Sequence, residues 1–440
     1  MLKSEYENMI NRCVRCSICK WIPQVQIKNQ EHASICPSID FYNFHSHSGG
    51  GRIILALALE MGRVEMNEKV RDIVFQCTAC GGCSIACQYL NTLDPTEVIM
   101  DLRRKLVQEG VGPMPKHQAF MDNVIQSGNP YGEPRKARAE WLEEGIEIDD
   151  SAETLYFVGC TSSYRRKEIA RATAKVLNKA GLAFKILGSD ETCCGSPLFR
   201  TGEDDQFEKI VERNVAMIEK AGIETVVCSC AGCFDMFRVE YPERASFSFN
   251  VISTAELFNR LIDEGRLKTG AGKDITVTYH DPCHLGRQAE VHEHWEGDVI
   301  EVMPIMKLNI PEKPKRCGAG GVYDAPRNVL EKLNNITLVE MDRIREYSYC
   351  CGAGGGAKAA FPEFALHTGK TRISEAESTG ATCVISACPF CSTNLKDSIK
   401  ESESSMDFKD LGELVLESLG RDEKNFDGMK EDMEGKHDES

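Results

Sequence analysis

Twenty-one cysteines constrain this 440-residue chain more than any other feature, and most of them recur at fixed intervals. The clearest case is "SYCCGAGGG", residues 348–356, in which Cys350 and Cys351 are adjacent and a run of glycines follows. Neighbouring cysteines fit a disulfide poorly, because its two Cα atoms normally lie well apart. A packed core would not use so many glycines, since they bury no side chain and lose much backbone entropy. The stretch therefore indicates two thiolates directed at one inorganic group.

Clustered cysteines are typical of metal ligands or redox thiols when the protein stays in a reducing compartment. The N-terminus, "MLKSEYENMINRC", lacks the apolar core of an export signal, and the longest apolar run, "IILALAL", is too short to span a bilayer. We therefore expect a cytoplasmic protein that reaches the inner face of a membrane only through a partner. The net charge of −16 argues against nucleic acid and against docking on anionic lipid.

Two cysteine runs, "CVRCSIC" and "CTACGGCSIAC", lie near the N-terminus. Such runs hold cubane [4Fe–4S] clusters, and the fourth cysteine of each run serves the other cluster. One predicted ligand set is Cys13, Cys16, Cys19 and Cys87. The other is Cys36, Cys77, Cys80 and Cys83. A zinc site would use two CxxC pairs instead of two triplets, so zinc is disfavoured. The segment resembles the α-helical two-cluster ferredoxin modules of respiratory complexes, although Cys36 arrives late and Gln88 replaces the usual proline.

Short apolar strands alternate with helical patterns in the rest of the chain. The predicted strands are "TLYFVGC", "AFKILG", "ETVVCSCAGC", "DITVTYHDPC", "ITLVEM" and "ATCVISACPFC". This alternation predicts parallel or mostly parallel sheets, with cysteines at the carboxyl ends of strands, where ligands gather in α/β folds.

The strand–helix pattern with its cysteines occurs twice in the chain. Aligning "AGIETVVCSCAGC" with "TGATCVISACPFC" places Cys230 over Cys388 and Cys233 over Cys391. The expected fold class is a multidomain α+β and α/β chain, in which a helical ferredoxin-like module precedes two duplicated α/β domains. The expected plan is a module at 1–108, an extended linker at 109–150, duplicated domains at 151–270 and 271–420, an insertion near 288–321, and a disordered acidic tail at 421–440.

The repeated pattern, together with "HDPCHLGR" before the second repeat, resembles the CCG domains of heterodisulfide reductase. The whole layout resembles the D-type subunits of that family, or its C-type and B-type subunits fused. In that family each complete CCG motif binds a noncubane [4Fe–4S] cluster through five cysteines. The resemblance implies a first set of Cys160, Cys193, Cys194, Cys230 and Cys233. It implies a second set of Cys283, Cys350, Cys351, Cys388 and Cys391. Gly195 and Gly352, which follow the vicinal pairs, are expected to clear room beside the clusters.

The first ligand of the second set has two candidates. Thirty-two residues separate Cys317 from Cys350, as they separate Cys160 from Cys193, so spacing favours Cys317. Cys283 ends a predicted strand and carries the family wording, and we prefer it. Residues 288–321 then form an insertion that covers the cluster or contacts a partner. Three cysteines lie outside all sets: Cys228 and Cys383 are expected to be buried bystanders, and Cys317 stays the alternative ligand.

Other polar residues are candidates near the clusters. His284 could protonate a leaving thiolate, because histidine titrates near neutrality, and Arg287 could hold an anionic substrate. His280 has either a packing or a proton-delivery role. His45 and His47 are interpreted as a structural loop, and "SSYRRKE" as a helix start rather than a substrate site.

Two functions remain open. In the first, cubane clusters pass electrons to noncubane clusters that cleave or form a small disulfide in a cleft between the repeats. In the second, the chain relays electrons between a flavoprotein dehydrogenase and another carrier. No G-x-G-x-x-G follows a strand at the start of a βαβ unit, so a flavin is not implied, and "GAGGGAK" lacks the Walker pattern. Electrons must then come from a flavoprotein, from some other electron-donor protein or from a membrane-bound redox partner.

Overall fold

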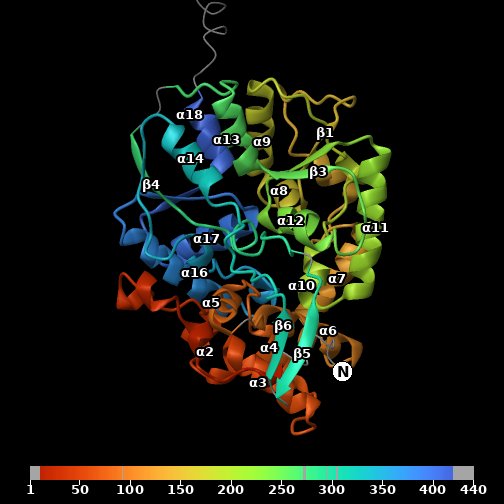
Figure 1. Ribbon diagram of the computed structural model, residues 1–440. Helices are drawn as coiled ribbons and strands as arrows, with labels where there is room; N and C mark the ends of the chain where they lie inside the picture. The colour runs from red at the N-terminus through yellow and green to blue at the C-terminus, as the bar shows by residue number, and fades with distance from the viewer. Residues whose placement is uncertain (1–9, 92, 271–273, 294, 304–305, 420–440) are drawn as a thin grey trace, which may run out of the picture.

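The computed structural model describes residues 10–91, 93–270, 274–293, 295–303 and 306–419 (Figure 1). The expected disordered tail at 421–440 lies outside the described residues. A helical N-terminal part lies against one end of two α/β domains, each built on its own parallel sheet. Among the residues described, no helix combines the length and apolar character needed to cross a bilayer.

The N-terminal part is helical, as predicted. Its α-helices are α2 (Pro37–Tyr42), α3 (Gly49–Glu60), α4 (Glu68–Phe75), α5 (Gly82–Asn91) and α6 (Pro95–Gln108). Three short 3₁₀ turns precede α2: η1 (Ile18–Lys20), η2 (Gln24–Gln26) and η3 (Gln30–His32); a fourth, η4 (His45–His47), lies between α2 and α3. Ser48 caps α3 and Asp94 caps α6 through side-chain oxygens that accept backbone N–H groups. Ile53, Val74 and Leu106 belong to the small core between these helices.

The segment 109–150 is not the extended connection that its prolines and glycines suggested. It contains helix α7 (Pro115–Ser127) and the 3₁₀ turn η5 (Arg135–Ala139). Pro115 occupies the first turn of α7, and Gly128 ends the helix with a φ of 71°. Met121 and Val124 pack into the main core. The proline and the glycine therefore mark the two ends of a helix.

The first α/β domain has the parallel strand order β1-β2-β3, with β1 Thr154–Phe157, β2 Thr225–Cys228 and β3 Asn250–Ser253. Its helical elements are α8 (Cys160–Tyr164), α9 (Lys167–Lys179), η6 (Gly188–Asp190), α10 (Ser196–Thr201), α11 (Asp204–Lys220), α12 (Ala231–Asp235), the π-helical turn η7 (Met236–Glu240) and α13 (Thr254–Asp263). The predicted strand "AFKILG" is wrong, because this stretch keeps only an isolated bridge between Leu155 and Lys185.

The second α/β domain has the parallel order β7-β4-β8-β9, with β4 Ile275–Tyr279, β7 Ile336–Leu338, β8 Cys383–Ser386 and β9 Asp407–Asp410. Its helical elements are α14 (Asp324–Lys332), η8 (Arg345–Tyr347), α15 (Ala357–Ala360), α16 (Pro362–Glu377), α17 (Pro389–Glu401) and α18 (Leu411–Ser418). Both domains share one continuous apolar core. Their strands therefore present their cysteine-bearing ends to a common region.

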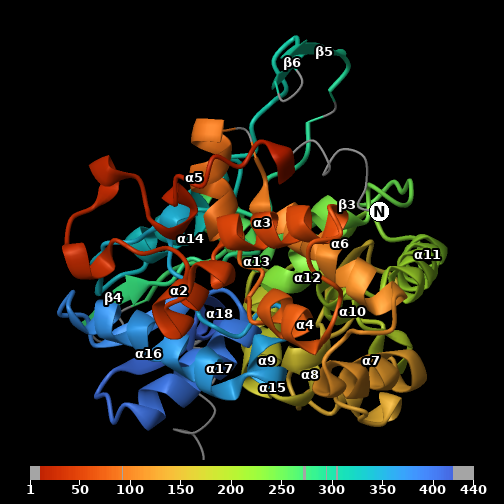
Figure 2. The same cartoon turned by 90° about the horizontal axis from the view of Figure 1, so that it is seen from below.

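The segment expected as an insertion folds into an antiparallel hairpin, β5 (Asp298–Met303) with β6 (Met306–Ile310). Figure 2 shows this hairpin projecting away from the body of the molecule. Ile300 and Leu308 face each other across the hairpin and are both 46% exposed.

Candidate functional site

A cavity of about 780 Å³ lies between the two α/β domains, where the sequence predicted a cleft. Nine cysteines line it: Cys160, Cys193, Cys194, Cys230, Cys233, Cys283, Cys351, Cys388 and Cys391. Cys160 follows β1, Cys230 follows β2, Cys283 follows β4 and Cys388 follows β8. The parallel sheets thus bring both predicted CCG sets to one space, since strand ends of the same polarity meet at one edge.

The two sets have the same internal pairing. In the first, Cys160 hydrogen-bonds Cys193, and in the second Cys283 hydrogen-bonds Cys350. These contacts raise the pKa of Cys160 and of Cys350 well above the usual thiol value. The geometry therefore makes Cys283 the counterpart of Cys160, despite the longer spacing.

The second cysteine of each vicinal pair is the more acidic one. Hydrogen bonds from Cys193 and Cys233 lower the pKa of Cys194 to about 6. Hydrogen bonds from Cys350 and Cys391 lower the pKa of Cys351 well below its usual value. A thiolate is the form that binds metal.

The two sets also meet each other and a histidine. Cys230 of the first set hydrogen-bonds Cys388 of the second. His280 lies with Cys351 and Cys391 in a buried group whose ligand atoms are all within 4.8 Å of one another. Arg372 donates a hydrogen bond to His280 Nδ1 at 3.1 Å, which orients the ring. His280 is therefore placed against the thiols of the second set.

The electrostatic neighbours of the N-terminal cysteines are consistent with the two predicted sets. Beyond the effect of burial, the thiols that raise the pKa of Cys87 are Cys19, Cys13 and Cys16, whereas those that act most on Cys83 are Cys36, Cys77 and Cys80. Burial raises the pKa of Cys36 and of Cys87 to about 12, so a bound iron would have to stabilise their thiolates.

The start of helix α3 lies between these two sets. The backbone N–H of Gly50 donates to Cys19 Sγ at 3.2 Å. A Cβ on the neighbouring Gly49 would lie 2.8 Å from Cys83 Cβ. The two predicted cubane sites therefore approach each other across the first turn of this helix.

The helical module meets the second CCG set directly. Cys80 packs with Cys283 and Cys350 in one buried group, and the Cys80 and Cys350 thiols hydrogen-bond. The glycine run after Cys351 lies against the loop that carries Cys77. A Cβ on Gly355 would lie 2.8 Å from the carbonyl oxygen of Cys77, so any side chain there would separate the two parts.

The two glycines expected to clear room beside a cluster have a different role. Gly195 and Gly352 adopt φ values of 84° and 92°, which L side chains rarely adopt. A Cβ on Gly195 would lie 2.5 Å from the Phe207 ring, and one on Gly352 would meet the Ala365 carbonyl. They permit the turn after each vicinal pair and its packing on α11 or α16, and their missing side chains do not face sulfur.

Arg287 is not a substrate ligand, which corrects the sequence-based expectation. It is 3% exposed and is not among the residues that line the cavity. Its guanidinium donates to the carbonyls of Cys80 at 2.8 Å, Glu346 at 2.7 Å and Ser348 at 2.7 Å. It therefore joins the cubane loop of Cys80 to the loop before Cys350.

His284 does line the cavity. Its Nδ1 lies 3.2 Å from Cys283 Sγ, and its Nε2 lies 3.4 Å from the Gln288 amide nitrogen. Burial, together with the nearby charge of Arg200, lowers the pKa of His284 well below its usual value. The ring is thus a neutral partner of a cavity cysteine.

The three remaining cysteines lie apart from these groups. Cys317 is half-buried in the insertion, where burial and the charge of Glu290 raise its pKa. Cys228 and Cys383 are buried at the C-terminal end of β2 and the N-terminal end of β8 respectively.

The positive lining of the cavity was not predicted from the sequence. The charged lining residues are all basic: Lys116, Arg165, Arg166, Arg200 and Lys358. Four of them are also ion-paired with acids that are not among the lining residues: Arg165 with Glu133, Arg166 with Glu168, Arg200 with Asp235 and Lys358 with Asp397. "SSYRRKE" spans the end of α8 and the start of α9, and its two arginines line the cavity as well. No motif marks these cations, because they come from four separate segments.

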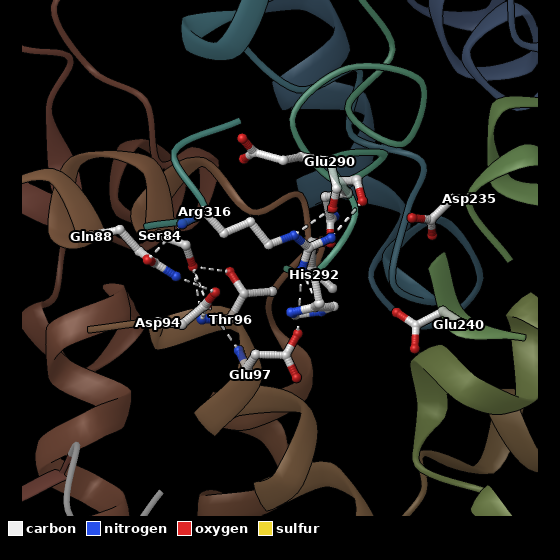
Figure 3. Close-up of polar contacts among 12 residues, drawn as sticks. Ser84, Gln88, Asp94, Thr96, Glu97, Asp235, Glu240, Glu290, His292 and Arg316 are labelled. Atoms are coloured by element: carbon white, nitrogen blue, oxygen red, sulfur yellow. Dashed lines mark hydrogen bonds and ion pairs between the residues drawn. The ribbon is translucent and has the colours of Figure 1, made fainter. Parts of the chain in front are cut away.

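A second cavity, of about 630 Å³, lies under the insertion. Figure 3 shows Arg316 of the insertion reaching the N-terminal part of the molecule. Its backbone N–H donates to the Gln88 side chain at 3.1 Å, and its guanidinium lies 3.9 Å from Glu97. Gln88 follows the predicted ligand Cys87. The insertion therefore packs beside the first cubane set.

Comparison with known proteins defines the class. Residues 9–90 match the 4Fe-4S dicluster domain, and residues 154–238, 277–325 and 316–396 match the cysteine-rich domain CCG. The order of these matches agrees with the fold, in which a helical dicluster module precedes the CCG domains. The chain is therefore an iron–sulfur protein of the oxidoreductase class.

Relatives identify the family. The chain is 36% identical to the D-type subunit of the dihydromethanophenazine:CoB–CoM heterodisulfide reductase of Methanosarcina mazei, over 94% of this chain and 95% of that protein. It therefore belongs to the family of D-type heterodisulfide reductase subunits, which are iron–sulfur oxidoreductases.

More distant relatives share most of this chain but are longer. The B-type subunit of the fumarate reductase (CoM/CoB) of Methanothermobacter marburgensis is 30% identical over 79% of this chain and 61% of its own length. The EtfAB:quinone oxidoreductase of Syntrophomonas wolfei is 26% identical over 93% of this chain and 58% of its own length. The crystal structure of a hypothetical protein from Helicobacter pylori has a similar fold, with a TM-score of 0.52 at 10% identity, covering 87% of this chain and 70% of that one.

Proposed function

We propose that the chain is a thiol–disulfide oxidoreductase that acts on a small anionic disulfide or the corresponding thiols in the cavity between its CCG domains. The observation that carries this proposal is the lining of that cavity, where nine cysteines from both sets face five basic side chains and no acidic ones among its lining residues. The chain as a whole has a net charge of −16, so a basic cavity is not a consequence of composition.

The donor atoms fit the clusters that the family implies. Each CCG set supplies five thiols, most of them buried, whose hydrogen-bond partners include other thiols of the same set. Thiolates are the ligands that iron–sulfur clusters use. Noncubane clusters at the two CCG sets, when bound, would supply single electrons and an iron that can accept a sulfur atom.

The protein's own residues would bind and orient the substrate. Lys116 and Arg166 both line the cavity, so they can bind the anionic groups of a substrate there. Arg200 is buried and paired with Asp235, so it contributes a fixed charge and little mobility. His284 keeps its Nδ1 against Cys283, beside the reacting space.

The overall reaction balances as one disulfide, two electrons and two protons giving two thiols. The order of contacts supports a path for the electrons. The cubane set of Cys80 touches the second CCG set at Cys350, and the second CCG set touches the first between Cys388 and Cys230. A partner protein supplies the electrons and solvent supplies the protons.

An electron-relay function is the second candidate. One relative is an EtfAB:quinone oxidoreductase, and another belongs to a fumarate reductase. A relay would pass electrons through the CCG sets without needing a basic cavity beside them. The cation lining therefore favours the disulfide chemistry.

The cluster assignment has a direct chemical test. We expect about sixteen irons and about sixteen acid-labile sulfides per chain after anaerobic loading, because four sets each hold four irons. Iron and sulfide analysis with electron paramagnetic resonance checks this. About eight irons, with signals from cubane clusters alone, would show that the CCG sets are empty.

The substrate proposal has a kinetic test. We expect reduced-dye turnover with disulfides that carry carboxylate, sulfonate or phosphate groups, and little turnover with neutral ones. In the Lys116→Gln and Arg166→Gln variants, KM for an anionic disulfide should rise roughly tenfold, which corresponds to losing about 1.4 kcal/mol of binding, with a smaller change in kcat.

The control for this test is Arg213→Gln on helix α11. Arg213 is exposed and is not among the residues that line the cavity. If no disulfide turns over, no thiol pair is oxidised and none alters the noncubane signals, the relay function is the correct one.

A further inference from the structure

The surface around Cys16 combines exposed apolar side chains with positive charge. Among the eight predicted cubane ligands, Cys16 is the exposed one, while Cys19 and Cys87 of the same set are buried. The segment that carries η1 to η3, in red, projects at the left of Figures 1 and 2. We call the following residues the input surface: Val14, Arg15, Lys20, Trp21, Val25 and Lys28.

The input surface exposes large apolar side chains. Val14 is 69% exposed, Trp21 44% and Val25 91%. Val14 lies between Cys13 and Cys16 in the sequence, so an apolar contact there would bring a partner next to the predicted cluster. Apolar contacts of this kind form the centre of most protein interfaces, and a basic or acidic rim surrounds them.

The charge of this surface is opposite to that of the chain. From Asn11 to Gln30 the sequence has four basic residues and no acidic one, whereas the whole chain has a net charge of −16. Arg15 and Lys28 are exposed. Lys20 and Arg15 also lie close enough to His45 that, after burial, their charges help to lower its pKa. Arg15 and Lys20 are therefore near the same histidine in space as well as close in sequence.

The backbone keeps this segment in place. Arg15 and Ser17 adopt φ values of 58° and 67° on either side of Cys16, so the chain turns sharply there. An isolated bridge joins Trp21 to Ser34, and the N–H of Ile22 donates to the carbonyl of Ala33 at 2.9 Å. The apolar and basic side chains are thus presented on a preformed loop, which lowers the entropic cost of docking.

We propose that the input surface docks an acidic electron-transfer protein, which places its redox centre next to Cys16. This inference rests on the cluster assignment in the proposed function. In each encounter the donor's cofactor loses one electron, the chain gains it, and no bond or proton is exchanged. Opposite charges accelerate such encounters, and electron-transfer complexes are small and transient.

The test uses the loaded full-length chain with a reduced, acidic two-cluster ferredoxin as the probe and basic cytochrome c as the charge-reversed control. Zero-length carbodiimide crosslinking followed by mass spectrometry maps the contacts. We expect crosslinks from Lys20 and Lys28 to ferredoxin carboxylates, and none to cytochrome c. Stopped-flow oxidation of the ferredoxin should slow at least tenfold between low and high ionic strength.

Charge reversal makes the test specific. The triple variant Arg15→Glu, Lys20→Glu, Lys28→Glu should lower the second-order rate constant with ferredoxin by roughly 10- to 100-fold at low salt. The matched control is Lys209→Glu, Arg213→Glu, Lys220→Glu on helix α11, whose three basic residues are exposed and lie on the other side of Figure 1. That triple should change the rate constant less than threefold. Iron content and paramagnetic spectra verify that every variant keeps its clusters.

The proposal is overturned if the crosslinks fall mainly on Lys313 and Lys315 of the insertion, or if both triple variants slow ferredoxin oxidation equally. It is also overturned if the rate constant does not depend on ionic strength. None of these readouts requires a disulfide, so they remain informative if the proposed disulfide chemistry fails.

Discussion

Replacing Cys283 by serine should remove one noncubane cluster, seen as the loss of its paramagnetic signal and of about four irons per chain. Cys283 touches Cys350 in the way that Cys160 touches Cys193, and it lines the cavity. Cys317→Ser should leave the iron content and the spectra unchanged, because Cys317 lies in the insertion with Glu290 as its leading charged neighbour.

Both variants are to be prepared and loaded anaerobically in parallel, so that loading efficiency cancels between them. Cys383→Ser, at another buried cysteine outside the predicted sets, controls for the general effect of losing a thiol. Loss of the cluster in Cys317→Ser with retention in Cys283→Ser would reverse the assignment. It would also show that the residues before Cys317 form the insertion.

Replacing Arg287 by methionine should destabilise the protein by about 3 kcal/mol and separate the helical module from the second CCG domain. Three buried carbonyls, of Cys80, Glu346 and Ser348, would lose their donor, and each buried unsatisfied polar group costs about 1–3 kcal/mol. Arg287→Lys should recover little of this, because one ammonium cannot reproduce the planar fork of a guanidinium.

Denaturant titration followed by cluster absorbance measures the effect of Arg287→Met. Electron transfer from reduced cubane clusters to the noncubane clusters should slow in the same variant, since Arg287 holds the Cys80 loop against the loop before Cys350. Arg213→Met on the exposed face of α11 is the control. A loss of less than about 1 kcal/mol would show that water or other donors satisfy the carbonyls.

The sequence predicted the parts of the site that local patterns encode. Cysteine spacing suggested the two N-terminal sets, the resemblance to CCG domains implied the other two, and the alternation of strands and helices placed Cys160 and Cys283 after strands. Strands β3 and β9 were not predicted. They are four residues long, and β9, "DFKD", has only one apolar residue, so periodicity carries almost no signal there.

Long-range contacts were the part that the sequence could not predict. Arg287 was expected to hold substrate because it follows a cluster motif. The sequence alone cannot tell whether such an arginine faces solvent or protein, and only the fold shows that its guanidinium donates to three carbonyls. The basic lining was not predicted for a similar reason. Lys116 lies in a helix within the segment that its prolines made look extended, and Lys358 follows the glycine run, so the sequence does not show that both side chains reach one cavity. Such clusters exist only after the chain has brought distant segments together.

The contact between Gly355 and the backbone of Cys77 is a joint made of main chain on both sides. Arg103 fastens the same joint, because its guanidinium donates to the carbonyls of Gly355 at 2.9 Å and Cys77 at 2.7 Å. Such a contact holds the helical N-terminal part against the second CCG domain whether or not a peptide bond connects the two. The covalent connection through residues 109–114 then serves to keep the helical N-terminal part at a high effective concentration near the CCG domains. The same architecture could accordingly be encoded as one gene or as two, and a chain cut within this connection would remain assembled.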